Sequence, residues 1–516
     1  MRGMGITRRT FLAAATTAIA ATMGVARAQY SEYDETSSAF QHGVASGDPL
    51  PTAVIIWTRL TTDEAVATVA WEVSTTPDFR TIVRHGEALA REEHDFTVHV
   101  DVTGLTPGTV YYYRFRAGED TSRTGRTKTA PTDPERAVFS VTSCANMESG
   151  YFGAYSEIAR RADEIDVALH LGDYFYEYAS GRYVGKSGIT RPHEPTWECT
   201  TLQDYRTRYA RYRRDAELQA AHAAVPWVVT WDDHECANDS WAAGVDLQRR
   251  DAAMQAYLEW MPIRATSPSA GGHIYRSLRF GGLAEVSMLD LRTYRSAPAR
   301  FKSSDPTRQM LGSEQFEWLT RQLTTSDAQW KLIGNSVMMA PLQILGTPLT
   351  EYLGHGMGSL PLNPDQWDGY QAERARLLEL VSRTPGCVFL TGDIHSEWAN
   401  ELRLNGSADG DPSGSGDEGA GAIAPEFVCT SVSAPNVDDK LRLPAGSATS
   451  RGLASYVRSV NPHVRHVELD AHGYMLVTVT REDVRAEWFR VADVETKGSP
   501  FTRGAVATWD GSVLTV

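Results

Sequence analysis

The feature that most constrains this chain is a set of five apolar, β-rich runs that each end in side chains able to bind a metal ion. Helical patterns separate several of these runs, which is typical of an α/β sheet with helices on its faces. Ligand sites in such sheets lie beyond the carboxyl ends of the strands. The five endings are therefore expected to lie close together. Their polar residues are Cys144 with Asn146, Asp173 with Tyr176, Asp232 to Glu235, Asn335, and Asp393 with His395.

Each ending taken alone has a simpler structural interpretation. A lone cysteine after a strand is usually a small buried apolar residue, and Gly-Asp is usually a turn or a helix cap. Together, however, the motifs bring several carboxylates to one place with no arginine or lysine inside them. Because buried carboxylates need counter-charge, the combination predicts a cluster of bound cations.

The candidate ligands divide by chemical hardness. Thiolate, phenolate and imidazole groups suit a transition metal, whereas the oxygens of aspartate and asparagine suit calcium, magnesium or manganese. A carboxylate such as Asp173 can bridge two ions. Two or more ions about 3.5–4 Å apart can polarise a phosphoryl group and deprotonate a water molecule.

Residues 38–130 follow a different pattern. Short runs of alternating aromatic or β-branched and polar residues are separated by turn residues, which predicts a small antiparallel sandwich. The stretch GLTPGTVYYYRFRAG, residues 104–118, resembles the tyrosine-bearing strand of fibronectin type III or Ig-like modules. Residues 129–136 contain two prolines and are predicted to be a linker. Residues 137–500 are then the predicted catalytic domain.

The N-terminus, residues 1–28, resembles a twin-arginine signal peptide. Arg8-Arg9 precedes a modest apolar stretch, and Ala26-Arg27-Ala28 has the pattern of a cleavage site. The apolar stretch is shorter than the about 20 residues that a membrane span needs, and no later segment is apolar enough. We therefore expect export by the twin-arginine machinery to a secreted, periplasmic or cell-wall-associated location, with no transmembrane segment.

Net charge limits the kinds of binding partner that can be expected, and the cysteine count limits the possible disulfides. The formal net charge of −15 becomes −19 once the four arginines of residues 1–28 are removed, and this argues against nucleic acid as a partner. Five cysteines leave at least one thiol without a partner, and a disulfide between Cys199 and Cys236 stays open. Residues 404–422, rich in Gly, Ser and Asp, are expected to form a solvated surface loop. A monomer is expected.

Four ordered motifs after the predicted sandwich resemble the D-type alkaline phosphatase (PhoD) family of calcineurin-like metallophosphoesterases. The motifs are SCAN (143–146), LGDYFYEY (171–178), WDDHE (231–235) and GDIH (392–395). The resemblance covers residues 38–500 and implies a metallophosphoesterase-type sheet sandwich flanked by helices. Related purple acid phosphatases use Gly-Asp-x-x-Tyr, Gly-Asn-His-Glu and Gly-His-x-His. Here Asp233 replaces the metal-binding Asn, and Asp393 replaces the first His of the third motif.

The resemblance also implies the ions and the role of each residue. Ferric iron would be bound by Cys144, Asp173, Tyr176 and His395, and calcium by Asp173, Asp233 and Asp393, with Asn335 as a further member. His234 would stabilise the transition state or protonate the leaving group. Asn146, Asp232 and Asn238 would support the ligands or contact the phosphate. His463 and His472 could orient a ligand but are not predicted to be ligands.

The function that the resemblance implies is an exported phosphoester hydrolase, in which a metal-bound hydroxide attacks phosphorus of a monoester or diester. An exported phospholipase D-type phosphodiesterase with the same metals stays open as the alternative. The complete ligand set argues against a binding module. A serine hydrolase is disfavoured because Met338 stands where the nucleophile elbow around Ser336 needs glycine.

Overall fold

The computed structural model describes residues 39–267, 270–298, 303–343, 363–404 and 421–516. The predicted signal peptide, residues 1–28, and residues 405–420 of the predicted surface loop lie outside these ranges. Among the described residues, no helix combines the length and the apolar character that a membrane crossing requires.

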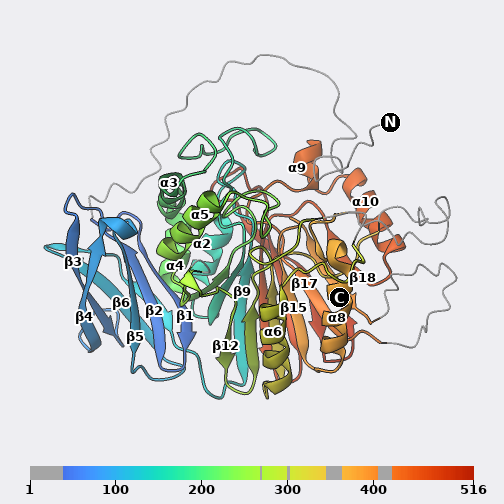
Figure 1. Ribbon diagram of the computed structural model, residues 1–516, viewed down its shortest axis with the longest axis horizontal. Coiled ribbons are helices and arrows are strands. Elements are labelled where there is room, and N and C mark those ends of the chain that lie inside the picture. Colours follow the sequence, from blue (N-terminus) through green and yellow to red (C-terminus); the bar gives the residue numbers. More distant parts are fainter. Residues whose placement is uncertain (1–38, 268–269, 299–302, 344–362, 405–420) are drawn as a thin grey trace, which may run out of the picture.

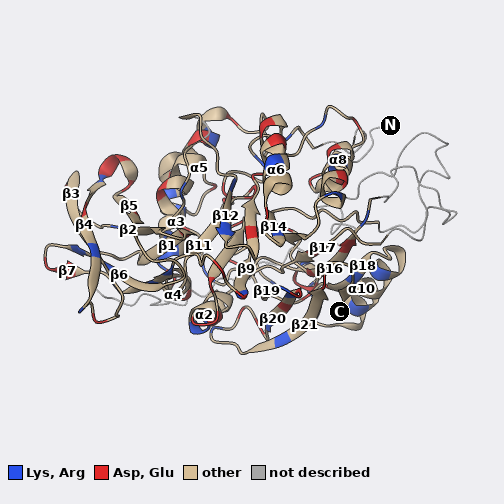
Figure 2. Ribbon diagram, turned by 90° about the horizontal axis from the view of Figure 1, so that it is seen from below, with Lys and Arg blue, Asp and Glu red and all other residues tan. Residues whose placement is uncertain are grey.

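Two mixed sheets pack face to face at the centre of the molecule (Figures 1 and 2). The ten-stranded sheet runs from edge to edge as β22 (Leu514–Thr515), β21 (Phe501–Trp509), β20 (Val484–Val491), β19 (Gly473–Thr480), β9 (Arg136–Thr142), β10 (Val167–Leu171), β11 (Trp227–Thr230), β1 (Val44–Leu50), β2 (Ala53–Arg59) and β5 (Thr97–Thr103). The seven-stranded sheet runs as β12 (Arg276–Phe280), β13 (Ala284–Met288), β14 (Trp330–Asn335), β15 (Cys387–Thr391), β17 (Ala424–Val428), β16 (Glu397–Leu402) and β18 (Val464–Glu468).

The main core lies between these two sheets. Their strands are apolar on the inner faces, so Phe139 and Leu169 of the ten-stranded sheet meet residues such as Leu332 and Val388 of the other. Within the sheets, β9, β10 and β11 are parallel neighbours, and so are β13, β14 and β15. Their carboxyl ends therefore lie at one edge of each sheet.

Helices cover the outer faces of both sheets, as the alternating sequence pattern predicts (Figure 2). On the ten-stranded sheet these are α2 (Gly153–Arg160), α3 (Leu202–Arg213), α4 (Ala216–Ala224) and α5 (Leu247–Trp260), and on the seven-stranded sheet α6 (Ser313–Thr325) and α8 (Gln371–Ser382). Capping side chains start several of them: Thr201, Asp215 and Asp246 each accept backbone N–H bonds in the first turn. Other helical elements are η1 (Glu92–His94), η3 (Trp367–Tyr370), α9 (Val437–Leu441) and α10 (Ala448–Val460).

The predicted N-terminal sandwich is present, and it lies at the left of Figure 1. Its second sheet consists of β4 (Ile82–Arg91), β3 (Val66–Ser74), β6 (Val110–Ala117), β7 (Asp120–Thr121) and β8 (Gly125–Lys128). Residues such as Ile56 and Val102 of β2 and β5 pack against Val73 and Phe115 of this sheet.

The first sheet of the sandwich is not separate from the rest of the molecule, which the sequence did not indicate. Strand β1 pairs in parallel with β11, where Gly47 lies opposite Trp227. A Cβ atom at Gly47 would lie 2.1 Å from the carbonyl oxygen of Pro262, so only glycine permits this approach. At the other edge, β21 and β22 continue the sheet past residue 500. The domain boundaries 38–130 and 137–500 stay predictions.

Candidate metal centre

The polar groups that follow the parallel strands come together as the strand pattern predicts. Asp173 is the common member of three overlapping sets of ligand atoms, each lying within 4.8 Å of one another: Cys144 with Asp173 and His395; Asp173 with Asp233 and His234; and Asp173 with Asp232, Asp233 and Asp393. All of these side chains are buried. With Tyr176 they form what we call the metal centre, to which both central sheets contribute.

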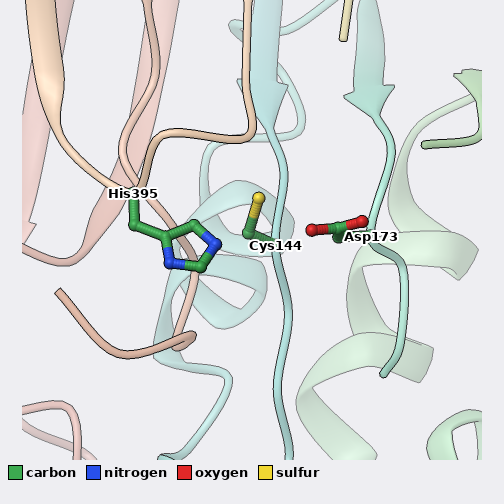
Figure 3. Close-up of side chains that lie close together, drawn as sticks. All are labelled: Cys144, Asp173 and His395. Atoms are coloured by element: carbon green, nitrogen blue, oxygen red, sulfur yellow. The ribbon is translucent and has the colours of Figure 1, made fainter. Parts of the chain in front are cut away.

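One half of the metal centre, here called the soft side, consists of Cys144, Tyr176 and His395 beside Asp173. The Tyr176 hydroxyl donates to Asp173 Oδ2 at 3.0 Å and lies 2.9 Å from His395 Nε2. Figure 3 shows Cys144 between the imidazole of His395 and the carboxylate of Asp173. Thiol, phenol, imidazole and carboxylate groups thus converge, and this donor set fits a transition metal.

The other half, the hard side, consists of Asp232, Asp233 and Asp393 beside Asp173. Arg292 donates two hydrogen bonds to Asp232, at 2.6 and 2.7 Å, and its Nη2 lies 3.6 Å from Asp233 Oδ1. The side-chain amide of Gln366 donates to the carboxylate of Asp393. The hard side therefore offers only oxygen ligands, and these fit a hard cation such as calcium.

His234 of this centre is held by a carboxylate of its own. Its Nδ1 lies 2.7 Å from Glu177 Oε2, and the other oxygen of Glu177 accepts the Asn238 backbone N–H at 2.8 Å. Burial disfavours the imidazolium, but the carboxylates of Asp233, Glu177 and Asp173 outweigh it and raise the pKa of His234 to about 10. This geometry leaves Nε2 as the nitrogen that can face a reacting group.

The pKa shifts of the side chains in the metal centre indicate whether these residues fit metal ions. Burial raises the pKa values of Asp173, Cys144 and Tyr176, and negatively charged neighbours raise them further. The protein alone thus disfavours the anionic forms that ligate metals, although it has collected these groups in one place. Bound cations reverse that preference because they stabilise the anions directly. The residues present therefore fit metal ions.

Backbone strain also marks the centre. Cys144, Asp173, Asp393 and His395 all have φ between 55° and 63°, a left-handed conformation that costs an L-residue about 1–2 kcal/mol. Such strain is concentrated where a fold must aim functional side chains. Gly172 beside them has φ 103°, and a Cβ atom there would lie 2.5 Å from the Asp232 backbone nitrogen. The Gly-Asp pair after β10 is thus a packing requirement as well as a ligand position.

The remaining predicted residues lie around the centre, where their proposed roles stay predictions. The Asn335 amide accepts from Trp367 Nε1 at 2.9 Å and donates to Thr391 Oγ1 at 3.1 Å. The Asn146 amide donates to Ser149 Oγ and to the Tyr183 carbonyl. Asn238 is exposed at the rim, and its Oδ1 accepts from the Tyr178 hydroxyl.

Two histidines and the cysteine pair can also be placed. His463 contacts the Pro341 carbonyl, and His472 contacts Ser431 and Asp439, so both lie outside the sets of converging ligand atoms. All five cysteines of the chain are described and all are free thiols, so Cys199 and Cys236 form no disulfide.

Several residues of the site were not identified from the sequence. They are Glu177, Arg292, Asp365 and Gln366. Arg292 supplies the counter-charge that the motifs lack, and it follows β13 in the stretch LDLRTYR. This is the same signal, a polar ending of an apolar run, that marks the five recognised endings. Glu235 accepts three backbone N–H bonds, from Asp173, Tyr174 and Asp232, and no sequence pattern indicates this role.

Comparisons with known proteins agree with this geometry. A family model described as PhoD-like phosphatase matches residues 139–488, and one described as PhoD-like phosphatase, N-terminal domain, matches residues 24–131. Alkaline phosphatase D of Bacillus subtilis (strain 168) is 37% identical over 485 residues, which cover 88% of this chain and 78% of that protein.

Solved structures give the same result. A solved structure of PhoD superposes with a TM-score of 0.82 and 34% identity, covering 95% of this chain and 93% of the other. A purple acid phosphatase from yellow lupin (Lupinus luteus) seeds gives a TM-score of 0.54 at 12% identity, covering 89% and 73% of the two chains, which shows a shared fold alone. The predicted fold class is thereby confirmed.

Proposed function

The chain belongs to the PhoD-like phosphatase family and is a phosphoric ester hydrolase, and from this premise we propose that it is an exported enzyme that uses ferric iron and calcium. The observation that carries the proposal is the position of Asp173, which lies between a soft and a hard set of ligands. A carboxylate so placed can serve both ions at once.

The proposed division of ligands follows hardness. Cys144, Tyr176 and His395 hold ferric iron together with Asp173, because thiolate, phenolate and imidazole suit a transition metal. Asp233 and Asp393 hold calcium, and Asn335 adds its amide oxygen. Bound at these residues, the two cations would supply activation of the attacking water molecule and neutralisation of charge on the phosphoryl group.

The remaining chemistry belongs to residues of the chain. His234, oriented by Glu177, donates a proton to the leaving oxygen or stabilises charge on the phosphoryl oxygens. Asp232 stays in its two-bond pair with Arg292 and positions the adjacent Asp233. Asn238 at the rim is the candidate contact for the phosphate, and Asn146 supports the loop that carries Tyr183.

Substrate and location complete the proposal. The Arg8-Arg9 segment directs export through the twin-arginine machinery, which carries folded proteins and so accepts metals inserted beforehand. Phosphomonoesters and phosphodiesters are the proposed substrates. An exported phospholipase D-type phosphodiesterase is the second candidate. The same metal ligands would serve both enzymes, and only the residues around the entrance to the site would differ.

A substrate panel tests this proposal. Purified, metal-loaded protein is assayed on an aryl monoester, a bis-aryl diester and phosphatidylcholine in vesicles. We expect turnover of the monoester and the diester. Hydrolysis of phosphatidylcholine alone would favour the second candidate. Absence of turnover on all three, with metals bound, would contradict both.

A further inference from the structure

We propose that His472 is a positioning residue that orients the imidazole of His395 through residues 431–436, here called the 431–436 loop. The inference deepens the proposed function and rests on the role of His395 as a metal ligand. His472 touches neither the metal centre nor a reacting atom, so its effect is transmitted by hydrogen bonds.

The loop contacts His395 on the side away from the metal centre. His395 Nδ1 lies 3.1 Å from the Pro435 carbonyl oxygen, and its Nε2 lies 2.9 Å from the Tyr176 hydroxyl. A ligating histidine commonly donates its second N–H to a carbonyl, which fixes both the tautomer and the ring orientation. The position of the Pro435 carbonyl therefore decides how Nε2 is presented.

The position of the Pro435 carbonyl matters because His395 Nδ1 has a second possible hydrogen-bond partner nearby. The Tyr183 hydroxyl lies 3.3 Å from the same Nδ1. If the Pro435 carbonyl moved away, the ring could turn toward Tyr183 and draw Nε2 off the soft side. His395 also has φ 55°, so its backbone conformation is held by its surroundings rather than preferred.

His472 is connected by hydrogen bonds to both ends of the 431–436 loop. At the first end, its Nδ1 lies 3.0 Å from Ser431 Oγ, which is 2.7 Å from the Ala434 carbonyl oxygen. At the second end, its Nε2 lies 2.8 Å from Asp439 Oδ2, and the same carboxylate oxygen accepts the Asn436 backbone N–H at 3.1 Å. Because an ionised carboxylate only accepts, Nε2 carries a proton.

The loop and the His472 segment are joined by a third bond as well. The Asn436 amide donates to the Ala471 carbonyl at 2.7 Å. The side chain of His472 is buried, so these bonds are shielded from water. One imidazole thus ties the start and the end of the segment that presents the Pro435 carbonyl.

His463 provides a matched control. It lies nine residues earlier in the chain, and its Nε2 contacts the Pro341 carbonyl at 2.8 Å. That carbonyl lies outside the 431–436 loop. Removing either imidazole therefore removes a largely buried ring with backbone or side-chain hydrogen bonds, but only His472 leads to His395.

The test compares full-length, metal-loaded protein with its His472→Ala and His463→Ala variants. We measure thermal stability, the rate of iron loss to a strong chelator, and kcat and KM on a monoester. His472→Ala should lose iron roughly 10–100-fold faster and show a kcat lower by a similar factor. His463→Ala should lower thermal stability only.

Two amide variants separate positioning from folding. His472→Asn keeps a polar group near the Nδ1 position and can still reach Ser431, whereas His472→Gln extends toward Asp439. We expect His472→Asn to retain iron better than His472→Ala at equal thermal stability, since Ser431 belongs to the loop itself.

The outcomes are distinct. If the parent enzyme holds iron and His472→Ala matches His463→Ala in iron loss and kcat, the positioning role is overturned. The role would also be overturned if His472→Ala, His472→Asn and His472→Gln all lost thermal stability to the same extent and did not differ from one another in iron retention. A parent protein that contains no transition metal would overturn the metal assignment of the proposed function and this role with it.

Discussion

The soft side and the hard side of the metal centre share Asp173 but are compensated differently. On the hard side, Arg292 donates twice to Asp232 and approaches Asp233, so the protein itself supplies a cation there. On the soft side, none of the ion pairs among the described residues joins Asp173 to an arginine or a lysine.

This difference indicates how firmly each ion should be held. Buried anions that no arginine or lysine neutralises depend on the bound metal, so the soft side should release its ion slowly. The hard side is partly neutralised by Arg292, and oxygen ligands bind calcium in an exchangeable way. One centre should therefore combine a permanent ion with a replaceable one.

Selective removal of calcium should give the largest effect. Treatment with EGTA should reduce turnover to background while iron stays bound, and added calcium should restore it. Elemental analysis of the treated protein and the activity assay check this together. Unchanged turnover after EGTA would mean that the hard side holds no calcium needed for the reaction.

Replacing the two histidines should separate a ligand from a proton donor. His234→Ala should retain iron and lose roughly 10²–10⁴ in rate, the usual contribution of one general acid or base. His395→Ala should release iron, because His395 is a proposed ligand of the soft side. Iron analysis and kcat of both variants provide the comparison, and equal iron loss would make His234 a ligand as well.

Removing one charge from the hard side should weaken calcium alone. Asp233→Asn should raise the calcium concentration for half-maximal activity by roughly tenfold or more, since calcium affinity follows ligand charge. Iron content should not change. Asp327→Asn, an exposed carboxylate paired with Arg279, controls for the loss of charge. Equal loss of iron and calcium in Asp233→Asn would end the distinction between the two sides.

The smallest effect should come from Glu177→Gln, which leaves both sides intact. The Glu177 carboxylate lies 2.7 Å from His234 and is one of the groups that raise the pKa of His234, so its neutralisation lowers that pKa. A group that acts when protonated then loses its proton at lower pH, and the alkaline limb of kcat shifts downward. We expect about a tenfold loss of kcat at alkaline pH and a smaller loss near neutrality. An unshifted pH profile would remove the acid role of His234.

Much of this site could be predicted from the sequence because its ligands follow strands. Asp173, Asp233 and Asp393 each come directly after an apolar run, and parallel strands bring such endings together. Arg292 follows the same rule after β13, but a cation among predicted anions has no motif of its own. The contacts of Glu177 and His472 could not be predicted, since each joins residues that are distant along the chain.

The fold was also predictable where it leaves a periodic pattern in the sequence, but not where it depends on contacts between distant segments. Alternating helices and β-rich runs fix the layers, and period-two patterns fix the N-terminal sandwich. The parallel pairing of Gly47 with Trp227 joins the two parts, and it depends on a close backbone approach that leaves no periodic signal. Cys199 and Cys236 illustrate the same limit, because sequence spacing alone left open a pairing that the structure does not form.

The visible absorption spectrum tests the central claim most directly. Phenolate bound to ferric iron absorbs visible light by charge transfer, so protein purified after native export should be coloured and contain iron. Tyr176→Phe should lose most of this band while the calcium requirement of any residual activity persists. A fully active parent protein that is colourless and contains no iron would contradict the account.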